Sequence, residues 1–395
     1  MSQTTANFRL GVLASHPIQY QAPIFRELAR QVDLVVHFAH EQTPQGQADA
    51  GFGVAFEWDS DLLAGYEHVF LQNIAAKPGP GHFFGCNTPG IRQHIRNGNF
   101  SAFLVMGWNL LSYWQAVSVC RKLGIVVMSR GDSHLETPGS SLKKLIKKIL
   151  YPWMLNRFDA HLFVGLHNKA YLSHYGVAEE KLFFSPHCIS GEQFARNHSK
   201  NDQPQCKIAL GENPSTVVLL FCGRLVEFKR VHDLLDAIGS DELAAMDLCL
   251  LLAGDGPLRE SLQKRVTETG LKVRFLGFRN QSQLPQIYTA ADLVVLPSSG
   301  EETWGLVVNE ALACGTPVVV SDKAGSSADM VVANETGMIY SCGNIPALVQ
   351  AIVAALKIEQ GSAAIAARNR IYSVSNAAAG IISAAEKILE RKKHG

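Results

Sequence analysis

Residues 302–317 read Glu302-Thr303-Trp304-Gly305-Leu306-Val307-Val308-Asn309-Glu310-Ala311-Leu312-Ala313-Cys314-Gly315-Thr316-Pro317. The preceding residues, 291–297, form a short aliphatic run between turn formers, which predicts a buried strand. Residues 306–314 then predict a helix, because Gly315 follows as a stop signal and Pro317 lies just beyond it. A strand, a loop and a helix in this order indicate an α/β sheet, which binds ligands at the carboxyl ends of its strands.

Two carboxylates of this stretch are predicted to face one ligand. Glu302 lies in the loop, and Glu310 lies about one turn inside the helix. Helical side chains lean toward the N-terminus, so Glu310 points back toward the same edge. Free N–H groups around Trp304, Gly305 and Leu306 add a site for an anion. Carboxylates for hydroxyls beside amides for phosphate indicate a sugar nucleotide. Alternatively, each Glu only complements the helix dipole, which is worth about 0.3–1 kcal/mol.

A second strand and helix carry a group of cations. Residues 216–222 predict a buried strand, and residues 231–238 predict an amphipathic helix. Arg224, Lys229 and Arg230 lie between them, at the positive end of the helix, where cations are disfavoured. A bound anion would explain these cations, and the alternative is a solvated basic edge. Together with the two glutamates, they favour a diphosphate site.

Further pieces of sequence surround these residues in a specific order. They are Gly223-Arg224 with Lys229, Ala253 to Leu258, Leu276-Gly277-Phe278, Tyr288 to Ser298, the Glu302/Glu310 pair and Ala313 to Val319. In order and spacing the chain resembles the retaining nucleotide-sugar glycosyltransferases of the GT-B fold type, in their family four (glycosyl transferases group 1). The resemblance covers most of the chain. It implies an α/β protein with two Rossmann-like domains facing across a central cleft, and a C-terminal helix, about 377–392, that crosses back to the first domain.

The resemblance also implies roles for matching residues. Arg224 and Lys229 would hold the donor diphosphate and, with Glu302, act in catalysis without a metal or cofactor. Glu302 would bind hydroxyls of the transferred sugar, and Glu310 would bind the ribose. The backbone near Phe278 would meet the base, although this residue could equally be a core aromatic. The donor site would comprise Gly223, Arg224, Lys229, Phe278, Arg279, Thr303, Trp304, Gly305, Leu306 and Glu310. UDP or GDP is the expected nucleotide, and the family implies retention of anomeric configuration.

The N-terminal half is expected to bind the acceptor, a bacterial surface glycan or a lipid-linked one. Loops after predicted strands supply the candidates: His16, Tyr20, Gln21, Trp108, Asn109, Arg130 and Asp132. Many relatives have a glycine-rich loop after the first strand and a His after the fourth, where this chain has residues 15–17 and 129–132. Four of the candidates, Tyr20, Gln21, Trp108 and Asn109, could instead serve packing or capping. Arg130 and Asp132 could pair with each other.

Strands separated by helical spans support two parallel sheets. In the first half, strands are expected at 8–14, 34–38, 102–106, 125–129 and 160–164. The polar stretch 197–204 predicts a linker, so we expect domains at 1–200 and 201–376 and the returning helix within 377–395.

Composition narrows the class of protein. A net charge of +1 over 395 residues argues against a nucleic-acid partner. The eight cysteines form no C-x-x-C pair, which favours a reducing compartment over a disulfide framework or a zinc site. The N-terminus lacks a signal sequence, and no apolar run approaches the roughly 20 residues of a membrane span. We therefore expect a cytoplasmic protein.

Residues 141–155 form a basic amphipathic stretch. Such a helix can rest on anionic lipid, which would make the protein peripheral on the inner membrane face and fit a lipid-linked acceptor. The alternative, favoured by the sequence, is that the Leu/Ile face packs on the N-terminal sheet. Two alternatives to glycosyl transfer also stay open: an epimerase or hydrolase of the same fold, and an inactive nucleotide-binding scaffold.

Overall fold

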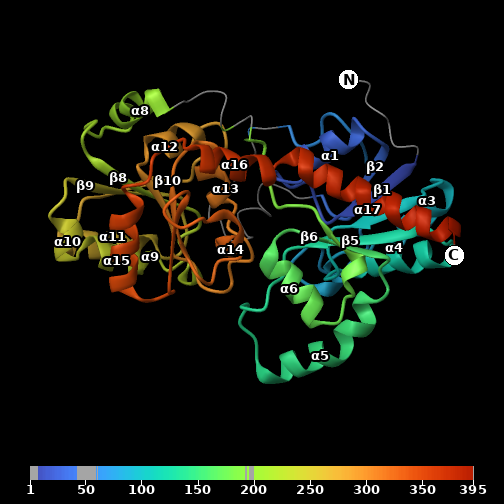
Figure 1. Ribbon diagram of the computed structural model, residues 1–395. Coiled ribbons are helices and arrows are strands. Elements are labelled where there is room, and N and C mark those ends of the chain that lie inside the picture. Colours follow the sequence, from blue (N-terminus) through green and yellow to red (C-terminus); the bar gives the residue numbers. More distant parts are fainter. Residues whose placement is uncertain (1–7, 42–58, 60, 192–193, 195–199, 395) are drawn as a thin grey trace.

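The computed structural model describes residues 8–41, 59, 61–191, 194 and 200–394. They form two α/β domains, each with its own parallel sheet flanked by helices (Figure 1). The fold class predicted from the sequence is therefore confirmed. Within the described residues, no helix is both long enough and apolar enough to cross a bilayer.

The N-terminal sheet has seven parallel strands in the order β3-β2-β1-β4-β5-β6-β7. The strands are β1 Arg9–Ala14, β2 Asp33–Phe38, β3 Glu67–Phe70, β4 Ala102–Val105, β5 Val126–Gly131, β6 Ala160–Phe163 and β7 Leu182–Phe184. The helices are α1 Ala22–Ala29, η2 Phe83–Gly85, α3 Ile91–Asn97, α4 Leu111–Lys122, α5 Ser141–Leu155, α6 Leu166–His174 and η3 Glu179–Lys181. In β1, Val12 and Leu13 enter different hydrophobic clusters. The sheet is thus buried on both faces, which explains its aliphatic strands.

The C-terminal sheet has six parallel strands in the order β10-β9-β8-β11-β12-β13. The strands are β8 Val217–Cys222, β9 Leu248–Ala253, β10 Val273–Gly277, β11 Leu293–Leu296, β12 Val318–Ser321 and β13 Gly337–Tyr340. The helices are η4 Lys200–Asp202, α8 Gln203–Ala209, η5 Glu227–Lys229, α9 Val231–Ile238, α10 Asp241–Ala244, α11 Arg259–Thr269, α12 Leu284–Ala290, α13 Val307–Ala313, α14 Ser327–Met330, α15 Ile345–Ala355 and α16 Ala363–Ile371. Alternate residues of β8, such as Leu220 and Phe221, again enter different clusters.

The five N-terminal strands predicted from the sequence are all present, but β3 and β7 were missed. Both are edge strands, and their residues are at most half-buried. An edge strand needs only a short run with little hydrophobic periodicity, so neither Glu67–Phe70 nor Leu182–Phe184 gave a clear pattern.

Strand order determines where a ligand can bind. In the first domain, successive strands are added on one side of β1 up to β3, and the chain then returns to add β4 on the other side of β1. In the second domain, the same change of side occurs between β8 and β11. Open parallel sheets bind ligands at such a point, beyond the carboxyl ends of the two strands. The loops after β8 and β11 carry Arg224 and Glu302, and the loops after β1 and β4 carry His16 and Trp108.

The last helix, α17 Val374–His394, crosses back onto the first domain, as predicted (Figure 1). It packs against α1, and Ile381 and Ile388 belong to the core of the N-terminal sheet. The Ser185 hydroxyl donates a hydrogen bond of 2.9 Å to the Ala377 carbonyl oxygen. The predicted linker, 197–204, falls partly outside the described residues. Its described part, from residue 200, forms η4 and the start of α8.

The apolar face of helix α5 points to solvent, whereas the sequence favoured packing of this face on the N-terminal sheet. Its Leu/Ile side chains do not pack on the sheet: Leu145, Ile146 and Ile149 are 55%, 51% and 73% exposed. Among the described side chains, α5 is anchored near its end, where Leu155 is 1% exposed and Tyr151 packs against the same hydrophobic cluster. The packing interpretation is therefore wrong for the apolar face. Figure 1 shows α5 at the margin of the N-terminal domain, away from the C-terminal domain.

Gly380 offers a test of how tightly α17 docks. A Cβ atom at this position would lie 1.9 Å from the Phe184 carbonyl oxygen. Inside a helix, Gly→Ala normally stabilises by about 0.5–1 kcal/mol. Here the clash should reverse that sign, and Gly380→Ala should destabilise the protein by about 1–3 kcal/mol. Thermal unfolding measures the change.

The matched control is Gly139→Ala, where a Cβ would meet nothing within 4 Å. This substitution should shift stability by no more than about 0.5 kcal/mol. A Gly380→Ala protein that melts at or above the parental temperature would contradict the tight contact between α17 and β7.

Candidate active site

The loop after β11 leads into α13, which spans Val307–Ala313 and so lies within the predicted 306–314. Gly305 precedes the helix with a φ of +91°, and Gly315 follows it with a φ of +81°. Both values favour glycine over other residues. The loop is fixed from outside, because the Ser299 N–H donates to the Phe228 carbonyl at 2.8 Å and the Gly325 N–H donates to the Glu302 carbonyl at 3.1 Å. Glu302 is therefore held in a defined backbone position.

Glu302 and Lys229 form an ion pair at the carboxyl ends of β8 and β11. The Lys229 ammonium donates to Glu302 Oε2, and the Ser298 hydroxyl donates to the same oxygen at 3.0 Å. The two charged side chains are only 10% and 13% exposed. Taking two charges out of water is costly unless they are paired and hydrogen-bonded, as these are. The structure thus brings together two of the three residues predicted to act in catalysis.

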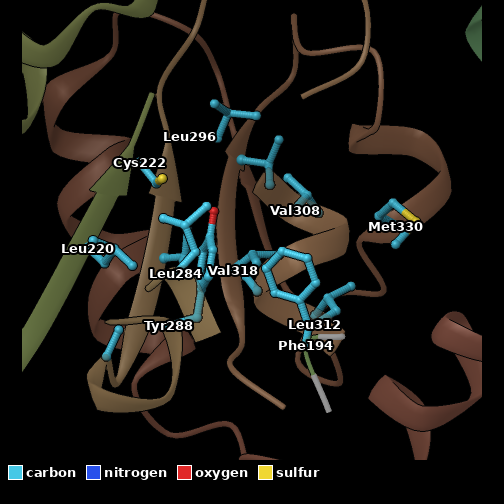
Figure 2. Close-up of a cluster of buried hydrophobic side chains, with 14 of the residues drawn as sticks. Phe194, Leu220, Cys222, Leu284, Tyr288, Leu296, Val308, Leu312, Val318 and Met330 are labelled. Carbon is cyan, nitrogen blue, oxygen red and sulfur yellow. The ribbon is translucent and has the colours of Figure 1, made fainter. Parts of the chain in front are cut away.

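Glu310 lies on the buried side of the same region. The Tyr288 hydroxyl, from α12, donates to Glu310 Oε2 at 2.5 Å. Figure 2 shows Tyr288 among aliphatic side chains, with its hydroxyl end toward Cys222. Burial raises the pKa of Glu310, and the Tyr288 hydrogen bond and the Lys229 charge oppose this increase. Lys229 therefore acts electrostatically on both Glu302 and Glu310.

The other cations near β8 differ in their surroundings. Arg230 has a φ of +51° and forms a forked ion pair with Asp233, with N–O distances of 2.7 and 3.1 Å. Asp233 thus supplies a counter-charge to Arg230 from within the chain, so a bound anion is not needed to explain this cation. Arg224 is half-buried in the loop directly after β8. The preceding residue, Gly223, is in close contact with Gly254, since a Cβ at Gly254 would lie 1.9 Å from the Gly223 carbonyl oxygen.

Polar contacts join the two domains beside the loop after β11, which carries Glu302 and Thr303. The Thr303 hydroxyl donates to Asp132 Oδ2 at 2.8 Å, and His187 Nε2 lies 3.8 Å from the same oxygen. Burial raises the pKa of Asp132, but the interactions with His187 and Thr303 outweigh this and lower it to about 2. Burial also lowers the pKa of His187, despite the nearby carboxylate. Near neutral pH, Asp132 is therefore charged.

Two further contacts bridge the domains. Lys323 forms an ion pair with Glu136 at 2.7 Å, and the Leu166 N–H donates to both carboxylate oxygens of Asp329 at 3.0 Å. Together with Asp132–Thr303, these contacts hold the loop after β5 and the start of α6 against the second domain. The carboxyl edges of the two sheets therefore face each other.

The residues predicted for the acceptor fall into two groups. Tyr20 reaches the domain boundary, because its ring packs edge-on against His187 at 5.0 Å and it lines a small cavity with Glu310. Asp132 also lies at the boundary. His16 is half-buried after β1, and burial together with His40 lowers its pKa to about 4.

The other candidates lie inside the first domain or on its surface. Arg130 is 3% exposed and donates to the Ser185 and Pro186 carbonyl oxygens and the Ser185 hydroxyl. Its hydrogen bonds thus go to the chain after β7, and not to Asp132. The Trp108 ring stacks on Tyr171. Gln21 is 7% exposed at the start of α1, and Asn109 is exposed.

Of the remaining donor candidates, Phe278 and Arg279 follow β10 and are half-buried. Trp304 is 3% exposed, and its Nε1–H donates to Asn309 Oδ1 at 2.7 Å. Trp304 also contacts the first domain, since its ring lies 5.5 Å from that of His187. Trp304 is therefore a packing residue at the boundary between the two domains. Within the described residues, no group of three His, Cys, Asp or Glu side chains is arranged to hold a metal ion.

Sequence reasoning missed several residues of this region. His187 was missed because it follows β7, the strand that went unpredicted. Tyr288 was part of the family pattern but had no role assigned, because only the fold brings its hydroxyl to Glu310. Ser298, two residues after β11, was likewise part of the family pattern with no role assigned, and it could have been found as a polar residue just beyond a buried strand.

Comparison with known proteins identifies the family. The sequence profile of the family described as glycosyl transferases group 1 matches residues 202–372. The D-inositol 3-phosphate glycosyltransferase of Corynebacterium diphtheriae is 34% identical over 340 residues, which cover 81% of this chain and 76% of that protein. This chain belongs to the glycosyl transferases group 1 family. The family inferred from the sequence resemblance is thereby confirmed.

Other relatives of this group 1 chain align over shorter segments. The GDP-mannose-dependent alpha-(1-6)-phosphatidylinositol dimannoside mannosyltransferase of Mycobacterium tuberculosis is 38% identical over 109 residues, 27% of this chain and 28% of that protein. In several such alignments the chain spans only 28–42% of the relative's length. Among solved structures, Anabaena HepE in complex with UDP and glucose has a TM-score of 0.66 at 17% identity, covering 98% of this chain and 100% of that one. This likeness shows a shared fold.

Proposed function

We propose that this chain is a retaining, metal-independent glycosyltransferase that moves a sugar from a nucleoside diphosphate sugar to an acceptor hydroxyl. The observation that carries the proposal is Lys229, which acts on Glu302 and Glu310 at the switch point of the second sheet, beside Arg224. One cation between two carboxylates suits a ligand that has a diphosphate flanked by two sugars.

The donor would lie along the carboxyl edge of the second sheet. Arg224 and Lys229 would contact the diphosphate, Glu310 would accept from the ribose hydroxyls, and Glu302 would accept from hydroxyls of the transferred sugar. Backbone amides at 303–306 and near residues 278–279 would complete the site. UDP or GDP is the expected nucleotide. Two relatives support this: HepE binds UDP, and the mycobacterial relative is named as GDP-mannose-dependent.

The reaction forms a bond between the acceptor oxygen and the anomeric carbon, and it breaks the bond from that carbon to the donor phosphate oxygen. The acceptor would attack from the face that the phosphate leaves, so the configuration is retained. The acceptor proton would pass to the departing phosphate. Negative charge grows on that phosphate, and a fixed group aimed at such charge is commonly worth about 3–4 kcal/mol. Arg224 and Lys229 would supply it without a metal.

The acceptor would bind on the first domain, near Tyr20, Asp132 and His16, and we propose a bacterial surface or lipid-linked glycan. The Mycobacterium tuberculosis relative is named for a phosphatidylinositol dimannoside substrate, which supports a lipid-linked class. We also propose a cytoplasmic location. All eight cysteines are free, which fits a reducing compartment.

Nucleotide titration tests the donor site. Calorimetry with UDP, GDP and ADP in EDTA should find one nucleotide that binds without metal. Because hydrogen bonds to charged groups contribute about 1.5–3 kcal/mol each, the Arg224→Ala/Lys229→Ala double variant should bind at least about a hundredfold more weakly. The control is Lys272→Ala, which removes a cation from the opposite edge of the same sheet, where it pairs with Glu212 and Asp247. Unchanged affinity in the double variant would rule out the phosphate assignment, and no binding of any nucleotide would favour a scaffold.

Turnover tests the role of Glu302. Glu302→Gln keeps the size of the side chain but removes its charge, so kcat should fall by roughly a hundredfold, the effect of losing one group that stabilises the transition state. The affinity for the nucleotide diphosphate should change much less, because that ligand lacks the sugar. The assay follows transfer to an acceptor and the products from donor alone, since release of free or epimerised sugar would indicate a hydrolase or epimerase. A fully active Glu302→Gln protein would remove this residue from the mechanism.

Ribose recognition tests Glu310 and its partner Tyr288. Tyr288→Phe keeps the ring but removes the hydroxyl that orients Glu310, so the preference for the ribonucleotide over its 2′-deoxy analogue should fall roughly tenfold, or about 1.4 kcal/mol. Tyr340→Phe is the matched control in this domain, because the Tyr340 hydroxyl is buried and has no hydrogen-bond partner among the described residues. Equal preferences in the parent and the Tyr288→Phe protein would show that Tyr288 only packs.

A further inference from the structure

Helix α5 presents its apolar side chains to solvent. Five large residues on it are 44–73% exposed: Leu145, Ile146, Ile149, Leu150 and Trp153. At 3.6 residues per turn these positions fall within an arc of about 140°, so they form one continuous stripe along the helix. The opposite side anchors the end of α5, since Leu155 is buried and Tyr151 is half-buried. The stripe therefore faces outward, because Leu155 and Tyr151 attach the opposite side of the helix to the domain.

Lysines flank this stripe on both sides. On the helical wheel, Lys147 lies about 60° beyond Leu150, and Lys148 lies about 60° before Leu145. The Lys147 ammonium lies 5.5 Å from the centre of the Tyr151 ring, toward the anchored side. No Asp or Glu occurs in residues 141–155. An apolar stripe whose charged neighbours are all cations is typical of helices that lie in the interface of an anionic bilayer.

A basic groove continues the stripe at the end of α5. It has a volume of about 310 Å³, and its lining includes Trp114, Arg121, Lys122, Trp153 and Arg157. The Arg157 guanidinium stacks over the Trp153 ring at 4.2 Å, and Arg121 donates to the Arg157 carbonyl oxygen at 2.9 Å. Among the described residues, no acidic side chain lines the groove. Aromatic rings beside guanidinium groups suit the phosphate of a lipid headgroup, with Trp153 at the level of the interface.

We propose that α5 and this basic groove form a docking surface for an anionic lipid bilayer. The stripe would enter the headgroup region, while Lys147, Lys148 and the groove cations would contact lipid phosphates. A second copy of the chain is the less suitable occupant. Packing α5 on itself would bring lysines of both copies together with no acidic residue on either helix to pair with them. The proposal goes beyond glycosyl transfer and does not depend on the donor or acceptor.

Vesicle binding tests the surface directly, without any assay of activity. The purified full chain is sedimented with phosphatidylcholine vesicles, with and without phosphatidylglycerol, at low and high salt. Binding should require phosphatidylglycerol and weaken as salt screens the charges. Trp153 should report entry into the interface through a blue shift of its fluorescence. Trp153→Phe should lose much of this shift while the protein still sediments with vesicles.

Two sets of substitutions separate the apolar and charged parts. Ile149→Ser/Trp153→Ser should weaken vesicle binding at least about tenfold, because each removes apolar surface from the interface. Lys147→Gln/Lys148→Gln should weaken it roughly fivefold per lysine. All four residues lie on the surface, so melting temperatures should be unchanged. The matched control is Ile208→Ser in the second domain, at a residue 60% exposed, which should bind vesicles like the parent.

Three results would overturn the proposal. One is failure of the parent protein to bind vesicles that contain phosphatidylglycerol. The second is parental binding by the Ile149→Ser/Trp153→Ser protein. The third is self-association in sedimentation velocity that this same double variant abolishes, because a second copy would then cover the stripe.

Discussion

The ion pair between Lys229 and Glu302 is the interaction on which the rest of the site depends. It joins the loop after β8 to the loop after β11, at the point where strand order reverses. Two charges this deeply buried are tolerated only while each has partners, and Ser298 supplies another to Glu302. A phosphate arriving at Lys229 would share the lysine with Glu302 and leave that carboxylate able to accept from a sugar hydroxyl. Part of the charge arrangement that the proposed donor would need is thus already present in the folded chain.

The position of this pair relative to the first domain depends on a small set of contacts. Asp132 reaches Thr303, next in sequence to Glu302, and Trp304 packs beside His187. A movement of one domain against the other would therefore be transmitted to the backbone of the loop that carries Glu302 within one or two residues. Glycine makes this proximity possible, because a Cβ at Gly300 would come within 2.2 Å of the Glu136 carbonyl oxygen.

The sequence predicted those helices, strands and loop positions that depend on residues close together in the chain. Helix α13, strand β8 and the placing of Glu302 follow from aliphatic runs, glycine stops and the lean of helical side chains. It could not see contacts between segments far apart in the chain, such as Tyr288 with Glu310 or Asp132 with Thr303. It also favoured the wrong orientation for α5, because amphipathic periodicity shows that one face is apolar but not which way that face points.

The returning helix α17 has a consequence for how the chain is made. Its residues Ile381 and Ile388 fill the core of the N-terminal domain, yet they are synthesised after all the strands of the second sheet. At about 5–20 residues per second, roughly 200 residues separate the end of that domain from the helix that completes it, a delay of about 10–40 s. During this interval the emerging domain has an open apolar face between α1 and the sheet. The second domain can complete its own core first, so the two halves finish folding in the reverse of their order in the sequence.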